Sequence, residues 1–335
     1  MERREFCRFL GVCGLAACAG GLSGCSRALD WSSAQHARIV TREFGATPAP
    51  AEATASAAAT AAAKPAPAPP DIAVATGNDP AANARLAVAM LGGMGRFVKR
   101  GASVVIKPNI LTARPPEYGA STNPAAVAAV VKMCWDAGAK SVTVFDNSTA
   151  PPRQAYTVSG IQQAVQAAGA EMKVLTDRDF ERIAIPQGRV LTSWPLLTDV
   201  FDADVMINMP CAKTHGMAVL TLSMKNLMGV MGSTRGLIHQ EFTQKIVDVN
   251  TLIKPELIVL DAYRILFRNG PTGGGPQDVR LGRTCVAGTS QVSVDAYGTT
   301  LFRMKPTDLD YLTTASDQGL GVIDLSKLHI QKQSA

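Results

Sequence analysis

Lysine and histidine side chains gather in the segment of the chain between residues 210 and 239. Lys213, His215, Lys225 and His239 all lie there, among apolar residues and glycines. An apolar setting predicts burial, and a buried lysine or histidine is costly unless it is paired. Such amines and imidazoles could bind an anionic ligand, hold a metal through an imidazole nitrogen, or transfer protons. In the structural alternative, the lysines are exposed charges at helix ends and the histidines bond backbone groups.

Strands and helices alternate in the part of the chain that would have to position these side chains. Residues 103–107 form a short β-branched run that predicts a buried strand. Asn123 and Pro124 suit the start of a helix that Gly138 would end. This alternation indicates an α/β domain over 71–335, with a mostly parallel sheet covered by helices. The further strands are expected over 141–145, 172–175, 204–209 and 257–260, and further helices near 160–168 and 241–252.

Polar residues follow several of these expected strands. Lys107 and Asn109 end the first strand. Asp146 follows the second strand, and Asp261 follows the last. In open parallel sheets, ligands bind beyond the carboxyl ends of the strands, so these residues are candidates for a site. Asp and Asn are also common turn residues after a strand, which is the structural alternative. Asp295 opens a helix-like run and is a candidate either as a cap or as a site residue.

The motifs of the chain resemble those of a known family. Lys213-Thr214-His215, Lys225-Asn226-Leu227-Met228-Gly229 and Asp261-Ala262 occur in this order in the domain of unknown function 362 family. The resemblance covers residues 100–325 and implies an α/β fold, but no activity. Members of that family often carry an added ferredoxin-like cluster domain. The cysteines of this chain form no cluster motif, so no iron–sulfur cluster is expected.

A more distant resemblance implies a mechanism. His215 precedes Lys225 by nine intervening residues, and His239 follows after 13 more, a spacing similar to that of the lactate racemase family. That family binds a nickel-pincer nucleotide, which is joined to a lysine and whose nickel is held by a histidine. The resemblance implies that Lys225 carries the cofactor, that His239 is a metal ligand and that His215 is a proton-transfer base. Ser223-Met224 stand where the racemases have a glycine pair.

The motifs and the strand ends together give the set of candidate site residues. The catalytic candidates are His215, Lys213 and Asn226, and the candidate metal ligand is His239. The candidates for cofactor binding are Lys225, Lys107, Asn109, Asp261 and Asp295. The identity of the cofactor is left open between a nickel-pincer nucleotide and another metal.

The first 25 residues predict an export signal. Arg3 and Arg4 precede an apolar run of about 11 residues, which is too short for the roughly 20 residues of a membrane span. The arginine pair resembles the twin-arginine signal, and Leu22–Cys25 resembles the lipobox of bacterial lipoproteins. We expect the twin-arginine translocase to export the folded chain. A lipidated Cys25 would then anchor it to a membrane, facing the periplasm or cell envelope. The alternatives are a plain cleaved signal, in which Cys25 is incidental, and a cytoplasmic protein whose basic start is a coincidence.

Composition narrows the classes of protein to which the chain could belong. Residues 26–70 are rich in Ala and Pro, which predicts a flexible tether before the folded domain. The formal net charge is +6 with no dense run of Lys or Arg, so nothing indicates nucleic-acid binding. Cys134, Cys211 and Cys285 are widely spaced and odd in number, which predicts at least one free thiol and no disulfide scaffold.

Three classes of function are consistent with these patterns. The first is a cofactor-dependent enzyme of the cell envelope that acts on a small anionic organic substrate by proton or hydride transfer. The second is a membrane-anchored protein that binds an anion without chemistry. The third is a scaffold for the assembly of an envelope redox system. The twin-arginine route favours the enzyme, because that route carries folded proteins and often serves those loaded with a cofactor.

Overall fold

The structure is described from residue 68 onward. The computed structural model describes residues 68–335, all of which fall in one compact unit. The predicted signal segment and residues 26–67 of the predicted tether lie outside the described residues. Within residues 68–335, no helix is both long enough and apolar enough to cross a membrane.

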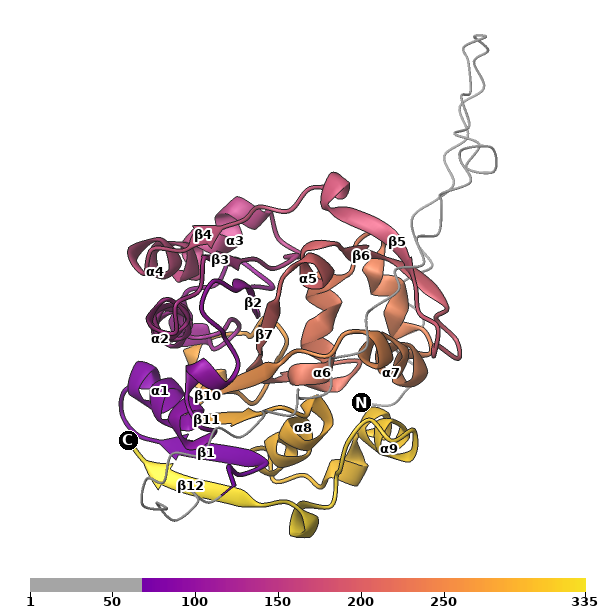
Figure 1. The fold of residues 1–335 in the computed structure, drawn as a ribbon. Coiled ribbons are helices and arrows are strands. Elements are labelled where there is room, and N and C mark those ends of the chain that lie inside the picture. Colours follow the sequence, from indigo (N-terminus) through magenta and orange to yellow (C-terminus); the bar gives the residue numbers. More distant parts are fainter. Residues whose placement is uncertain (1–67) are drawn as a thin grey trace, which may run out of the picture. The chain divides into compact units, whose positions relative to one another are not determined.

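One mixed sheet forms the centre of the domain (Figure 1). Its order is β12-β1-β11-β10-β7-β2-β3-β4. From β10 to β4 every neighbouring pair is parallel, whereas β11 runs antiparallel to both of its neighbours. The predicted α/β fold with a mostly parallel sheet is therefore confirmed. The strands are β1 (Ile72–Thr76), β2 (Ser103–Pro108), β3 (Ser141–Val144), β4 (Glu171–Met172), β7 (Val205–Met209), β10 (Leu257–Leu266), β11 (Val279–Gly288) and β12 (Ile330–Ser334), with β8 (Cys211–His215) and β9 (Val219–Thr221) branching from β10.

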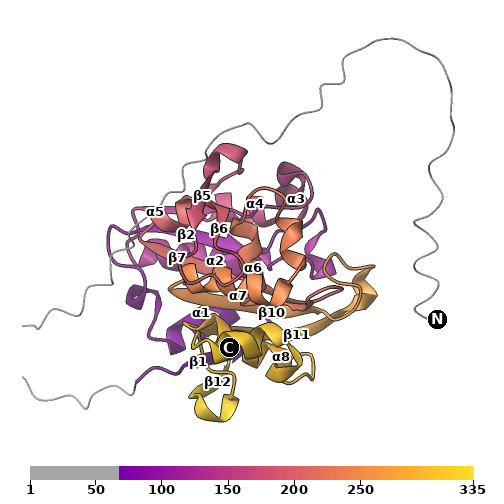
Figure 2. The ribbon, with the colours of Figure 1, turned by 90° about the vertical axis from the view of Figure 1, so that its right-hand side faces the viewer.

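Helices cover both faces of this sheet. Alternate residues of a strand point to opposite faces, so Val105 packs in the core with α7 and α8, whereas Val104 and Ile106 pack with α1 and α2. Figure 2 views the molecule from the side on which α6, α7 and α8 lie. Because both faces are buried, the strands read as continuous apolar runs. One face carries α1 (Pro80–Met90), α2 (Pro124–Asp136), α3 (Pro152–Val158) and α4 (Ile161–Ala167), and the other carries α6 (Ser223–Asn226), α7 (Phe242–Leu252), α8 (Gln291–Thr300) and α9 (Asp310–Asp317).

Helix α2 begins where the sequence predicts it. The Asn123 side chain accepts a hydrogen bond from Ala125 N at 3.0 Å, and Pro124 occupies the first turn, where an N–H is not needed. Gly138 follows the helix with φ +88°, a conformation that glycine adopts without strain. Asn123 N donates to Asp261 Oδ2 at 2.7 Å, so the start of α2 is tied to β10.

Strand β10 is longer than the strand expected over 257–260. It continues to Leu266, because beyond its contact with β7 its backbone pairs with β8 and β11. Asp261 therefore lies within a strand and not at its end. Its carboxylate accepts hydrogen bonds from the backbone N–H groups of Asn123 and Tyr263, and burial raises its pKa to about 6.

The segment between β4 and β7 departs further from the prediction. The strand expected over 172–175 is reduced to the two residues of β4, which pairs with β3 at the edge of the sheet. A separate antiparallel pair, β5 (Phe180–Ala184) and β6 (Ser193–Leu197), follows and was not predicted. The short helix α5 (Asp199–Asp202) then leads into β7.

Candidate functional site

A cavity of about 250 Å³ lies at the carboxyl ends of β2 and β3 and beside β8. Parallel strands end at the same edge of a sheet, which is why polar residues from distant parts of the chain meet here. Asp261 and Asp295 do not line the cavity. The other seven of the nine candidate residues do: Lys107, Asn109, Lys213, His215, Lys225, Asn226 and His239.

Asp295 has a structural role that differs from the predicted cofactor contact. It lies inside α8, fully buried, and its carboxylate accepts hydrogen bonds from Ser223 N at 2.6 Å and Met224 N at 2.9 Å. These are the first two N–H groups of α6, which have no partner within that helix. Burial raises the pKa of Asp295 to about 7. The carboxylate thus fixes the helix that carries Lys225.

Lys225 is a buried amine of the cavity with a lowered pKa. Its Nζ lies 3.4 Å from His239 Nε2 and 3.4 Å from Met228 Sδ, and 5.5 Å from the centroid of the Phe242 ring. Within residues 68–335, no carboxylate lies within ion-pair distance of this amine. Burial, together with the charges of Lys213 and Arg235, lowers the pKa of Lys225 to about 7. A substantial fraction of the amine is therefore neutral at neutral pH and can act as a nucleophile.

His239 faces Lys225 with its unprotonated ring nitrogen. Its Nδ1 lies 3.1 Å from Gly236 O, and a carbonyl oxygen can only accept, so Nδ1 carries the proton of the neutral ring. The lone pair of Nε2 then faces Lys225. The His239 ring stacks between those of His215 and Phe242, at centroid distances of 5.2 and 5.6 Å. Burial and the Lys225 charge lower the pKa of His239, which keeps this nitrogen available.

His215 has the opposite tautomer, and this corrects its predicted role as a base. Its Nδ1 accepts hydrogen bonds from Met217 N and Ala218 N, both at 3.2 Å. The proton of the neutral ring must therefore be on Nε2. Burial, with the charges of Lys225 and His239, lowers the pKa of His215 to about 3. A second proton would have to replace two backbone donors, so His215 is a hydrogen-bond donor.

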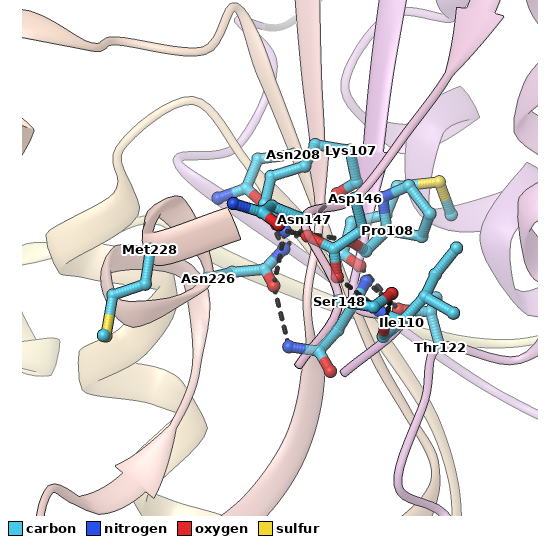
Figure 3. A network of polar contacts seen from close by, with 12 residues as sticks. Lys107, Pro108, Ile110, Thr122, Asp146, Asn147, Ser148, Asn208, Asn226 and Met228 are labelled. Carbon is cyan, nitrogen blue, oxygen red and sulfur yellow. Dashed lines mark hydrogen bonds and ion pairs between the residues drawn. The ribbon is translucent and has the colours of Figure 1, made fainter. Parts of the chain in front are cut away.

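A buried ion pair forms one wall of the cavity (Figure 3). Lys107 Nζ lies 2.8 Å from Asp146 Oδ1, and both side chains are almost fully buried. Asp146 Oδ2 also accepts from Ile110 N at 2.6 Å. Burial lowers the pKa of Lys107, although the charge of Asp146 opposes this shift. Asp146 was noted at a strand end but was absent from the candidate set.

Asn226 connects the buried lysines through its amide (Figure 3). Its Oδ1 accepts from Lys107 Nζ at 3.1 Å and from Asn109 Nδ2 at 2.9 Å. Its Nδ2 donates to Asn208 Oδ1 at 2.7 Å. Asn109 Oδ1 in turn accepts from Lys213 Nζ at 2.8 Å. Because both ends of the Asn226 amide are occupied, this residue positions the lysines and has no free group for a substrate.

Several cavity residues were missed by the sequence analysis. Arg235 lines the cavity and donates from a guanidinium N–H to Met228 O at 3.1 Å. No motif singles it out, because its place depends on the position of the short 3-10 helix Arg235–His239. Pro271 and Thr272 also line the cavity. They belong to a glycine- and proline-rich loop, residues 270–276, that the candidate set does not include.

The described residues can supply only part of a metal site. Within residues 68–335, no group of three His, Cys, Asp or Glu side chains is placed to hold a metal ion. A metal bound to His239 would take its remaining donor atoms from water or from a bound organic group. The amine of Lys225 and the unprotonated nitrogen of His239, 3.4 Å apart, fit a cofactor that is joined to a lysine and brings its own metal ligands. The three buried thiols, Cys134, Cys211 and Cys285, are free and outside the cavity lining.

Comparison with known proteins identifies relatives of this chain. The sequence profile of the family described as "Domain of unknown function (DUF362)" matches residues 104–300. The thylakoid-associated protein sll1697 of Synechocystis is 30% identical over 255 residues, which cover 72% of this chain and 75% of that protein.

Two solved structures are more distant. One is the lactate racemase apoprotein of Thermoanaerobacterium thermosaccharolyticum, with a TM-score of 0.45 and 12% identity over 68% of this chain. The other is a Thermotoga maritima protein, with a TM-score of 0.41 and 8% identity over 72% of this chain. The matched regions span 56% and 60% of those two chains.

Proposed function

Because the chain belongs to the domain of unknown function 362 family, whose description names no activity, we propose a function from the cavity itself. The protein is a cofactor-dependent enzyme that acts on a small anionic organic substrate by proton or hydride transfer. One observation carries the proposal: Lys225 Nζ lies 3.4 Å from His239 Nε2 in a cavity that also holds Lys213 and Arg235. A neutral amine beside an imidazole with an unprotonated nitrogen suits both covalent attachment and proton transfer.

The two imidazoles have different tasks in this enzyme. His239 Nε2 accepts a proton or binds a metal, because Nδ1 is committed to Gly236 O. His215 donates a hydrogen bond from Nε2 to a substrate oxygen, since its Nδ1 is occupied by two backbone N–H groups. A neutral imidazole donor of this kind stabilises negative charge that develops on an oxygen during reaction.

The cofactor that the sequence resemblance implies is a nickel-pincer nucleotide. Lys225 would hold it covalently and His239 would bind its metal, which are the two groups whose geometry fits. When bound, this group would supply hydride-transfer chemistry. Lys213 and Arg235 add positive charge to the same cavity, and water-excluded positive charge favours an anionic substrate. The remaining residues orient the substrate and hold the lysines in place.

The test uses protein purified from the cytoplasm in which it folds, before export. We expect intact mass to show an adduct, peptide mapping to place it on Lys225, and elemental analysis to find nickel or another metal. Lys225→Ala should remove the adduct and abolish turnover while leaving the fold intact. Lys327→Ala, which changes a lysine that is 73% exposed, is the matched control. Full activity in Lys225→Ala would show that the assigned site is wrong.

The same variants separate the other two classes of function. If the protein only binds an anion, Lys225→Ala weakens ligand binding and no turnover is found in either form. If it is a scaffold for a redox system, the variant retains function. An unmodified and metal-free wild-type mass would remove the cofactor from the proposal and leave the anion-binding protein as the better account.

The proposed place of action is the cell envelope, with the chain anchored through a lipid on Cys25. The support is the order of Arg3-Arg4, a short apolar run and the lipobox-like Leu22–Cys25. Cys25→Ala should move the protein from the membrane fraction to the soluble envelope fraction. A variant with Arg3 and Arg4 both changed to lysine should remain in the cytoplasm. Unchanged fractionation of both variants would contradict the proposal.

A further inference from the structure

We infer that Thr221 and Lys213 form an oxyanion-binding subsite in the wall of the cavity, which takes the carboxylate or phosphate oxygens of a small dianionic ligand. The inference rests on the proposed function in one respect, because it places the anionic end of a ligand of that enzyme. It adds a residue, Thr221, that neither the motifs nor the comparisons assign.

Thr221 carries a buried hydroxyl without a partner. The residue is 4% exposed and lines the cavity. Within residues 68–335, its Oγ1 is inaccessible to solvent and has no hydrogen-bond partner. Leaving such a group unsatisfied costs about 1–3 kcal/mol. A valine has the same shape and would avoid this cost, so the presence of a hydroxyl at this position needs an explanation. The hydroxyl is accounted for if a ligand oxygen accepts its hydrogen bond.

The hairpin formed by β8 and β9 places Lys213 opposite Thr221. Lys213 and Thr221 are directly opposite each other in the antiparallel pair, so their side chains leave the ribbon on the same face. Lys213 Nζ has three N–H donors, and two are used, by Asn109 Oδ1 at 2.8 Å and by Ala120 O. The third has no partner among residues 68–335, and we assign it to the ligand that Thr221 binds.

The charges of the cavity determine the charge of the ligand. Lys107 is compensated by Asp146, which is the carboxylate that lines the cavity. Within residues 68–335, Lys213 and Arg235 have no carboxylate at ion-pair distance. Uncompensated charge in a buried setting is costly. A ligand with two negative charges would compensate these two cations.

Two sources could supply such oxygens, a substrate carboxylate and a cofactor phosphate. The test is calorimetric titration of the full chain, free of adduct, with malonate and with inorganic phosphate as separate probes. Malonamide, which has the shape of malonate without its charge, is the control ligand. We expect at least one anion to bind and malonamide not to bind. Tighter malonate binding assigns the subsite to the substrate, and tighter phosphate binding assigns it to the cofactor.

The decisive variant is Thr221→Val, which removes the hydroxyl and keeps the shape. We expect anion affinity to fall about tenfold, because a hydrogen bond to a charged acceptor is lost. The melting temperature should stay equal or rise, because an unsatisfied group is removed. Thr221→Ser should restore binding. Tyr311→Phe removes an equally unpartnered buried hydroxyl outside the cavity lining and should change neither binding nor its anion preference.

Two results would overturn the subsite. One is a Thr221→Val protein that binds both anions within twofold of wild type, and the other is a wild-type protein that binds neither anion at millimolar concentration. These results are independent of the proposed function. A Lys225 adduct with no anion binding would keep the enzyme and remove the subsite. Anion binding without adduct or turnover would keep the subsite and remove the enzyme.

Discussion

At the scale of single residues, Gly229 shows how closely the cavity is built. Its position lies against the buried pair of Lys107 and Asp146, and its carbonyl accepts from Asn147 N at 3.1 Å. A Cβ here would overlap Asp146 Oδ1 and would stand 2.5 Å from Lys107 Nζ. The glycine that ends the Lys225–Gly229 motif is therefore required by close approach, and not by an unusual backbone angle.

Gly229→Ala should consequently break this pair. An uncompensated buried charge costs about 3–5 kcal/mol, so we expect a loss of this size in the free energy of unfolding, measured by urea denaturation. Gly216→Ala is the matched control, because a Cβ at that position would meet nothing within 4 Å. Equal stabilities of the two variants would show that the Lys107 and Asp146 side chains can move to accommodate the methyl group at little cost in free energy.

At the scale of secondary-structure elements, the important contact joins α8 to α6. Helix α6 has four residues, Ser223–Asn226, and such a short helix is not stable by itself. Its position comes from Asp295, whose carboxylate accepts from the N–H groups of Ser223 and Met224. The placement of Lys225 beside His239 therefore depends on a residue far away in sequence.

Asp295→Ala should displace Lys225 as well as destabilise the fold. We expect the variant to lose about 2 kcal/mol or more of stability, because two buried N–H groups lose their acceptor. Selective labelling of Lys225 by an amine reagent, followed by peptide mapping, should also decline. Asp79→Ala removes the side-chain cap of α1, where Asp79 accepts from Ala81 N at 2.8 Å. This control should cost about 1 kcal/mol and leave Lys225 labelling unchanged.

At the scale of the whole molecule, the buried amine of Lys225 gives stability an unusual dependence on pH. Burial lowers the pKa of Lys225 to about 7. In the unfolded chain this amine keeps its proton up to its ordinary pKa of about 10.4. Between these two pKa values unfolding takes up a proton, so raising the pH disfavours unfolding. Below pH 7, Lys225 no longer contributes to this slope, because the folded amine is also protonated.

We therefore expect the free energy of unfolding to rise between pH 7 and 9. The slope is about 1.4 kcal/mol per pH unit for each proton taken up. Urea denaturation across this range measures it. Lys225→Met, which keeps a chain of similar length without the charge, should reduce the slope. Above pH 9 the rise should stop. Burial raises the pKa of Cys134, Cys211 and Cys285, so these thiols lose their protons in the unfolded chain while they keep them in the folded one. Unfolding then releases protons, which offsets the proton taken up by Lys225. A flat profile for wild type would contradict the lowered pKa of Lys225.

Local sequence was enough to predict the fold class, several of its elements and a set of candidate residues that meet in one cavity. Alternating apolar strands and helices predicted the α/β fold, and the cap formed by Asn123 and Pro124 placed α2 correctly. Seven of the nine candidate residues line one cavity, because residues at the carboxyl ends of parallel strands meet at one edge of the sheet. Strand periodicity and helix caps act over a few residues, so they can be read along the chain.

Only the tertiary structure decided what each polar group does. The roles of Asp261 and Asp295 depend on backbone N–H groups from other elements. The protonated nitrogens of His215 and His239 are set by the backbone groups each ring meets. The meeting of Lys213 with Thr221 is set by strand register. Hydrogen-bond partners, burial and charge at a site depend on distances between segments far apart in sequence, and neither residue type nor spacing contains those distances.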